Sequence, residues 1–225
     1  MSKGTLTGRW LMEMFERMSA HFGPCNWWPA DSPLEMMAGA VLTQNTNWQN
    51  VEKALENLKK ARWLSLQTLH RLTERELAGA IRPAGYYNIK AGRLKNLVRF
   101  IVERYGTDLS AFLEEDTETL REGLLSVKGI GPETADSILL YAAGRPVFVV
   151  DAYTHRILAR HEMAEEQSTY HELQSLFMDH LPPDPGLFNE FHALIVRVGK
   201  TYCRKKADCG RCPLGRWGPA SPLAE

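Results

Sequence analysis

The chain has 225 residues, of which 44 % are hydrophobic, and its 27 lysines and arginines equal its 27 aspartates and glutamates. This is the composition of an ordinary globular protein with one or two domains, and its balanced charge favours no class of partner. No apolar run reaches the roughly 18 to 20 residues that span a bilayer, and charges interrupt the apolar positions of the N-terminal "MSKGTLTGRWLMEMFERM", so we expect a cytoplasmic protein without signal peptide or membrane anchor.

Apolar residues recur at three- and four-residue spacing along most of the chain, which predicts a mostly helical protein. Only Val147 to Val150 has the character of a strand, and it is too short to build a sheet. After Cys212 the periodicity ends, and we expect a loose tail over residues 214–225. The predicted helices cover residues 7–21, 33–43, 48–61, 65–81 in two pieces, 88–104, 117–126, 132–143, 152–160, 168–180 and 187–201.

Three tryptophans flank the predicted helix at 33–43, with Trp27 and Trp28 before it and Trp48 after it. A single tryptophan is most often a core or boundary anchor. Two adjacent tryptophans do not easily face the same core, however, so we expect at least one of them to line a cleft.

Residues 124–143 predict two helices joined by a tight turn that contains Gly129 and Gly131, with Pro132 at the first position of the second helix. The two glycines let the backbone approach another group closely, and the helix start leaves amide N–H groups unpaired. Together with Lys128, such a turn suits a phosphate. The alternative is a helix connection that needs glycine only for its backbone angles.

Asp151 directly follows the apolar run "PVFVV". A carboxylate at the end of a buried run needs donors or charges around it to stay ionised, so we expect a perturbed pKa, as is typical of catalytic carboxylates. An aspartate in front of "AYTHRILAR" would also cap the next helix. The two roles are compatible, because the capped amides would hold a catalytic side chain rigidly.

A short segment near the C-terminus carries three of the four cysteines, at Cys203, Cys209 and Cys212. In a cytosolic chain such a cluster indicates metal or cluster ligation rather than disulfides. The same segment contains Arg204 and Lys205, which contribute to a local basic patch suited to phosphate. The alternative is a solvated basic loop.

Several stretches together resemble the helix-hairpin-helix DNA glycosylases of the endonuclease III superfamily. They are "PLEMMAGAVLTQNTNWQNVEKAL", "GYYNIKAGRLKNL", "VKGIGPETA", "VFVVDAYTHRILAR" and "FNEFHALIVRVGKTYC". The resemblance implies an all-α fold in which two helical domains flank a DNA-binding cleft, and hydrolysis of the base–sugar bond of a flipped nucleotide. One domain would be a six-helix unit over 30–145 with the hairpin motif at about 124–143, and the other would combine 1–29 with 146–213.

The resemblance also implies roles for individual residues. Asp151 would stabilise the oxocarbenium-like sugar and orient or deprotonate water. Gln44 and Asn45 would fill the gap left by the flipped base, the alternative being a capped and solvated loop. The implied DNA contacts are Gln44, Asn45, Lys128, Gly129, Gly131, Arg204 and Lys205.

Glu133 departs from the bifunctional members of the family, which carry at this position a lysine that forms a Schiff base with the sugar. A carboxylate cannot form an imine, so we expect a monofunctional glycosylase. The combination of "NWWP" and "GAVLTQNT" is similar to the 3-methyladenine branch of the superfamily, and stacking on an indole face would favour a cationic alkylated purine. The predicted base pocket consists of Trp27, Trp28, Trp48 and Glu133.

The cysteine spacing is the other departure. Members with a 4Fe–4S cluster carry four cysteines spaced C-x6-C-x2-C-x5-C, whereas here five residues separate Cys203 from Cys209, two separate Cys209 from Cys212, and none follows. One ligand is therefore missing. We expect no stoichiometric cluster, although three ligands are present. The remaining alternatives for the fourth are Cys25, if its loop folds back, or a histidine or aspartate.

The predicted function is base excision repair by a monomer that binds double-stranded DNA with damaged bases, in the cytoplasm and associated with the nucleoid in a prokaryote. Two alternatives stay open. The first is an endonuclease III-like glycosylase or lyase that acts on damaged or mismatched pyrimidines. Glu133 argues against its lyase activity but not against its base specificity. A non-catalytic helix-hairpin-helix DNA-binding protein is opposed by Asp151, because mere binding needs no carboxylate at the end of a buried run.

Overall fold

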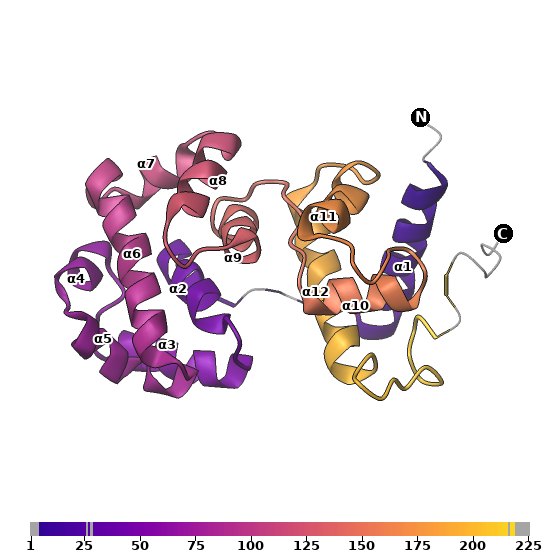
Figure 1. Cartoon of the computed structure of the whole chain (residues 1–225), viewed down its shortest axis with the longest axis horizontal. Coiled ribbons are helices and arrows are strands. Elements are labelled where there is room, and N and C mark those ends of the chain that lie inside the picture. The colour runs from indigo at the N-terminus through magenta and orange to yellow at the C-terminus, as the bar shows by residue number, and fades with distance from the viewer. Residues whose placement is uncertain (1–4, 26, 28, 216, 219–225) are drawn as a thin grey trace. The chain divides into compact units, whose positions relative to one another are not determined.

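The structure is a computed structural model that describes residues 5–25, 27, 29–215 and 217–218. The chain divides into two units, one formed by Met1–Trp27 with Pro146–Glu225 and the other by Trp28–Arg145, which we call unit 1 and unit 2 (Figure 1). Every regular element of the described residues is helical, which confirms the predicted all-α fold. None of the described helices is long and apolar enough to cross a membrane.

Unit 2 is built around helix α2 (Pro33–Thr43). The helix begins at Ser32, whose Oγ accepts a hydrogen bond from the Glu35 amide at 3.2 Å. Residues 34–42 are all buried, and a helix that is apolar on every side is stable only inside a core. Around it the chain forms α3 (Trp48–Lys60), α4 (Leu66–Arg71), α5 (Glu74–Ala80), η1 (Arg82–Ala84), α6 (Tyr87–Tyr105), α7 (Leu109–Glu114), α8 (Thr117–Ser126), α9 (Pro132–Ser137) and the π-helical turn η2 (Ile138–Ala142).

Lys90 of α6 ties the end of α2 to its neighbours. Its side chain is buried, and Nζ donates hydrogen bonds to the carbonyl oxygens of Leu42, at 2.8 Å, and Ala84, at 2.7 Å. Burial, with a smaller contribution from the charge of Arg93, lowers the pKa of Lys90 to about 8. These two hydrogen bonds fix the last turn of α2, which ends just before Gln44. Gln44 is one of the predicted DNA-contacting residues.

Unit 1 contains α1 (Leu6–Phe22), α10 (Ala152–Arg160), α11 (Tyr170–Met178) and α12 (Pro185–Thr201), and α12 packs against both α1 and α10. Residues 147–150 are buried, but they pair with no strand among the described residues. Side chains of α11 bond part of this backbone instead, since the Gln174 amide donates to the Phe148 carbonyl oxygen at 2.7 Å and the Val150 amide donates to the Tyr170 hydroxyl at 3.4 Å. The Phe148 ring stacks on Phe177 with 3.7 Å between centroids. This buried segment leads directly to Asp151.

The expected tail from residue 214 is wrong for its first part. Leu214 and Trp217 are buried, and the Trp217 ring meets Trp10 of α1 edge-on, with 6.3 Å between centroids. Isolated apolar residues that fill a gap between helices show no periodicity, which is why the sequence pattern missed them.

Candidate active site and cysteine loop

The turn between α8 and α9 forms the predicted hairpin in unit 2. Gly129 has a φ of +98°, a backbone conformation that side-chain-bearing residues rarely adopt, and a Cβ there would clash with the Arg93 side chain. Gly131 has an ordinary φ of −99° and precedes the first turn of α9. Lys128 is exposed. Position 129 therefore requires glycine, both for its backbone angle and for the contact with Arg93. At position 131 a Cβ would meet no atom within 4 Å.

Gln44 joins the loop after α2 to this hairpin. Its Nε2 donates to the Gly129 carbonyl oxygen at 3.2 Å and to Thr134 Oγ1 at 2.9 Å, while its Oε1 accepts from the Arg93 guanidinium. The neighbouring Asn45 is exposed and has a φ of +54°. The structure thus brings Gln44 to the hairpin and leaves Asn45 exposed, and it adds Arg93, which the sequence analysis missed.

Asp151 is the N-cap of α10 in unit 1, as predicted. Its Oδ1 accepts from the Thr154 amide at 2.8 Å and from Thr154 Oγ1 at 2.9 Å. Its Oδ2 lies 3.7 Å from Nε2 of His192. Burial raises the pKa of Asp151, but the nearby His192 imidazole and the Thr154 donors outweigh it, so that the pKa falls below the ordinary carboxyl value. The carboxylate is therefore anionic at neutral pH.

His192 was not anticipated. It is buried in α12 within the run "FHALIV". A lone histidine on an apolar helix is usually read as part of the core. The sequence does hold one indication of its role. A buried ionisable side chain needs a polar partner, and Asp151, at the end of the buried segment 147–150, is a candidate partner for His192.

The residues of the predicted base pocket are divided between the units. In unit 1, the Trp27 ring centroid lies 5.6 Å from the Lys200 ammonium nitrogen. In unit 2, Trp48 begins α3 and its Nε1 donates to Glu52 at 2.8 Å, while Glu133 is exposed in the first turn of α9. Trp28 lies outside the described residues. The pocket therefore stays a prediction.

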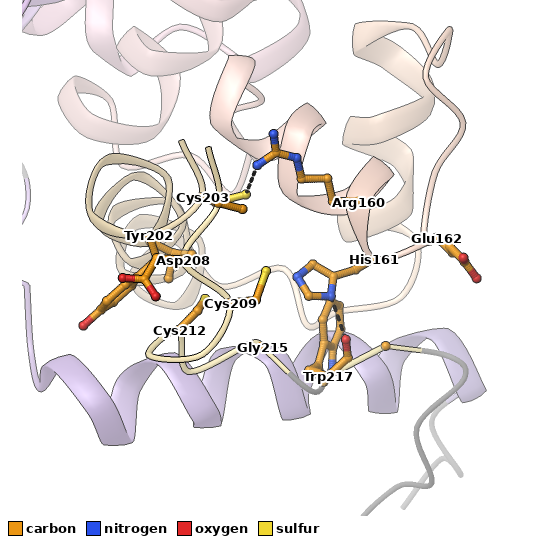
Figure 2. A pocket seen from close by; sticks show the side chains of 13 residues that line it. Arg160, His161, Glu162, Tyr202, Cys203, Asp208, Cys209, Cys212, Gly215 and Trp217 are labelled. Atoms are coloured by element: carbon orange, nitrogen blue, oxygen red, sulfur yellow. Dashed lines mark hydrogen bonds between the residues drawn. The ribbon is translucent and has the colours of Figure 1, made fainter. Parts of the chain in front are cut away.

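The loop after α12 and the end of α10 line a partly open cavity of about 320 Å³, shown in Figure 2. Arginines of α10 hold the start of this loop. Arg156 Nε donates to the Cys203 carbonyl oxygen at 2.7 Å, and Arg160 Nη1 donates to Cys203 Sγ at 3.2 Å and to the Arg204 carbonyl oxygen at 2.7 Å. The polar and sulfur-bearing side chains other than Trp217 that line the cavity are those of Arg160, His161, Glu162, Tyr202, Cys203, Asp208, Cys209 and Cys212.

The basic residues of this loop, Arg204 and Lys205, are exposed. Cys25 is not part of the cavity wall. Its Sγ accepts from Arg197 at 3.5 Å, and its amide donates to Glu190 at 2.7 Å. Within the described ranges no three His, Cys, Asp or Glu side chains are arranged to hold a single metal ion.

His161, which directly follows α10, points into the cavity from the side opposite the start of the loop (Figure 2). Its Nδ1 lies 2.6 Å from the Trp217 carbonyl oxygen. Burial lowers the pKa of His161, and the charge of Arg160 adds to this effect against the opposing hydrogen bond to Trp217. The ring is therefore neutral at neutral pH.

Comparison with known proteins identifies relatives over most of the chain. A family model described as "HhH-GPD superfamily base excision DNA repair protein" matches residues 38–183. A Methanocaldococcus jannaschii protein with the printed name "Putative DNA repair glycosylase" is 47 % identical over 205 residues, covering 91 % of this chain and 93 % of the relative. Endonuclease III of Thermotoga maritima is 29 % identical over 183 residues, covering 81 % and 80 %.

Solved structures that are similar to this chain also include DNA glycosylases and endonuclease III. The 3-methyladenine DNA glycosylase of H. pylori bound to 1,N6-ethenoadenine is similar with a TM-score of 0.74 and 32 % identity, over 84 % of this chain and 97 % of that one. An endonuclease III–DNA complex is similar in fold, with a TM-score of 0.80 and 21 % identity, over 96 % of each chain.

Proposed function

The chain belongs to the HhH-GPD superfamily of base excision DNA repair proteins, and from this premise we propose that it is a monofunctional glycosylase for alkylated purines such as 3-methyladenine. Repair glycosylases of this superfamily hydrolyse the bond between a base and its deoxyribose in DNA. Family membership does not say whether the enzyme also cleaves the DNA strand, nor which damaged base it releases. We argue these two points from particular residues.

The geometry of Asp151 carries the proposal. One of its oxygens is fixed by Thr154, so the carboxylate is held rigidly, while the other lies beside His192. A fixed anion stabilises positive charge that develops on the sugar as the base departs, because no reorganisation is needed at that moment. The lowered pKa keeps this anion available, and the same carboxylate can orient the attacking water.

Among the described residues, neither Lys90 nor Lys128 has the properties of a substitute for the lysine that the bifunctional members carry at position 133. Lys90, with its lowered pKa, has the property expected of a Schiff-base lysine, but it is 1 % exposed and donates to two backbone carbonyls. Lys128 is exposed in the hairpin turn, five residues before Glu133. These features support hydrolysis without strand cleavage.

The hairpin turn with Lys128, Gly129 and Gly131 is the proposed grip on the DNA backbone, with Arg204 and Lys205 as further phosphate contacts. The proposed roles of the two residues after α2 differ. Gln44 supports the turn through its bonds to Gly129 and Thr134. Asn45, exposed at a left-handed position, is the side chain proposed to fill the gap left by the flipped base.

The preference for alkylated purines is supported by the likeness to a 3-methyladenine glycosylase, at 32 % identity over 84 % of the chain. Trp27, Trp28 and Trp48 are the proposed stacking residues, because a cationic purine gains from the electron-rich indole face. Damaged or mismatched pyrimidines are the alternative, favoured by the relatives named endonuclease III.

The test is release of base from duplexes that each hold one lesion: 3-methyladenine, 1,N6-ethenoadenine, thymine glycol or uracil opposite guanine. Each product is analysed with and without alkali. We expect release of the alkylated purines and strand breaks only after alkali. Preferred release of thymine glycol or uracil would contradict the purine assignment, and breaks without alkali would contradict the monofunctional one.

A further inference from the structure

Arg93 lies on helix α6 beside the hairpin turn, half-buried and without an acidic partner. Its Nη1 donates to Oε1 of Gln44, and its aliphatic stem packs against Gly129, since a Cβ built on that glycine would clash with Arg93 Cγ. Among the described residues, Gln44 is the one hydrogen-bond partner of this guanidinium, and no carboxylate lies within ion-pair distance of it. The positive charge of Arg93 is therefore not neutralised by the protein.

Arg121, a second arginine beside the hairpin, shows the contrasting arrangement. It extends from α8 and donates to both carboxylate oxygens of Asp136 in α9, at 2.7 and 3.1 Å. Asp136 is fully buried, so this ion pair fixes the two helices of the hairpin to each other. The charges of the pair cancel, which leaves Arg93 as the stronger source of positive potential at the turn.

Lys90 places a second cation close to Arg93. It lies one turn earlier on α6, is buried, and donates to two backbone carbonyl oxygens. The charge of Arg93 contributes to the lowered pKa of Lys90, and no described carboxylate opposes this effect. Neighbouring cations without an acidic partner disfavour each other's charge until an anion approaches. The charges at this edge of unit 2 therefore favour a negatively charged ligand.

The backbone of the turn is arranged to accept such an anion. Asn96 of α6 donates to the Lys128 carbonyl oxygen at 3.0 Å, and Gln44 donates to the Gly129 carbonyl oxygen at 3.2 Å. Side chains thus engage two carbonyl oxygens that would otherwise repel a phosphate. The amide groups of Gly129 and Gly131 have no hydrogen-bond partner in the described part of the chain, so they are available to a phosphate oxygen.

We propose that Arg93 is a DNA-binding residue and supplies the fixed positive charge of the phosphate site at the hairpin. This inference rests on the proposed grip of the hairpin on DNA and names the side chain that provides its charge. Gln44 holds one end of the planar guanidinium, and the remaining N–H donors are left for a phosphate oxygen. Because Arg93 is held in place before DNA binds, it loses less side-chain freedom than the exposed Lys128 does.

The first measurement is the affinity of the full chain for an undamaged duplex as a function of salt. Arg93→Met keeps an apolar stem against Gly129 and removes the charge. It should weaken binding about tenfold and reduce the slope of log affinity against log salt by about 1, as for one lost phosphate contact. Arg93→Lys keeps the charge and should keep the wild-type slope. An unchanged slope in Arg93→Met, or an equal reduction in Arg93→Lys, would overturn the proposal.

Arg99→Met is the matched control for the loss of charge. Arg99 is exposed on the same helix, and the six residues after Arg93 advance the helix by about 1.7 turns to a different face. This variant should keep the wild-type affinity and slope. A reduction equal to that of Arg93→Met would indicate a general effect of net charge and would contradict a defined contact. No base is released from an undamaged duplex, so the inference can fail while the proposed function stands.

The second measurement needs no variant. Phenylglyoxal modifies accessible guanidinium groups, and mass spectrometry of the peptides reports each arginine separately. Arg93 should be modified in the free protein and protected when duplex DNA is bound, whereas Arg99 should be modified equally in both states. Equal modification of Arg93 with and without DNA would overturn the proposal, and so would an Arg93 that resists modification in the free protein. This result stands even if Arg93→Met does not fold.

Discussion

Nε2 of His192 lies 3.7 Å from Oδ2 of Asp151, and the two side chains are 6 % and 11 % exposed. The histidine comes from the middle of α12 and the aspartate from the N-cap of α10, so the pair links two helices that pack together in unit 1. Because Thr154 binds the other oxygen of Asp151, both sides of the carboxylate have a partner.

Removing the His192 imidazole should make the Asp151 carboxyl harder to ionise. In His192→Gln, burial continues to raise the pKa of Asp151 while the main opposing influence is gone, so the pKa should rise. We expect the acidic limb of the excision rate to move to higher pH, because the carboxylate takes up a proton at a higher pH than in wild type. Single-turnover base release across the acidic range checks this, and an unmoved limb would contradict it.

The same pair predicts a pH dependence of stability. The pKa of Asp151 is lower in the folded than in the unfolded chain, so its contribution is present above the ordinary carboxyl value of about 3.9 and is lost as pH falls through the lowered pKa. Asp151→Asn keeps a capping side chain but not the charge. Wild type should lose its stability advantage over this variant in acid, and an advantage that persists there would rule out the charge as its source.

Gln44 and Asn45 should separate stability from function. Gln44→Ala breaks the bonds to Gly129 and Thr134 and should lower the free energy of unfolding by about 1 to 3 kcal/mol. Asn45→Ala removes an exposed side chain, so its melting temperature should stay near that of wild type while excision from duplex DNA weakens. If Gln44→Ala leaves the melting temperature unchanged, the proposed support of the hairpin is wrong.

The two glycines of the hairpin offer a matched pair. Gly129→Ala imposes a side chain at a φ of +98° and against Arg93, and should destabilise the chain by about 1 to 3 kcal/mol or more and weaken DNA binding. A Cβ at Gly131 meets nothing within 4 Å, so Gly131→Ala should be close to neutral in stability. Denaturant unfolding and DNA titration distinguish them, and equal losses would argue against this assignment.

Glu133→Lys should allow the enzyme to form a Schiff base with the sugar of an abasic site. Borohydride treatment on an abasic duplex should trap little wild-type protein, because Glu133 cannot form an imine. A lysine at this exposed position should give a covalent complex. Strong trapping of the wild type would show that another amine serves.

Most of the fold could be predicted from periodicity, because long amphipathic helices such as α1, α6 and α12 carry a strong repeat. Helix α7 was missed, since its six residues offer a single buried position, Phe112. Local pattern also identified Asp151 as a cap. It could not identify His192 or His161, because their partners are distant in the sequence and a lone histidine carries no periodic signal.

Release of 3-methyladenine by Asp151→Asn, measured in a single turnover on a duplex with one lesion, tests the assignment of Asp151 most directly. The variant should be slower than wild type by about 10² to 10³-fold or more, as when one electrostatic stabiliser of a transition state is removed. Its DNA affinity should be unchanged or higher, because a negative charge near phosphates is gone. Near-normal release by a correctly folded D151N would contradict the catalytic role of Asp151.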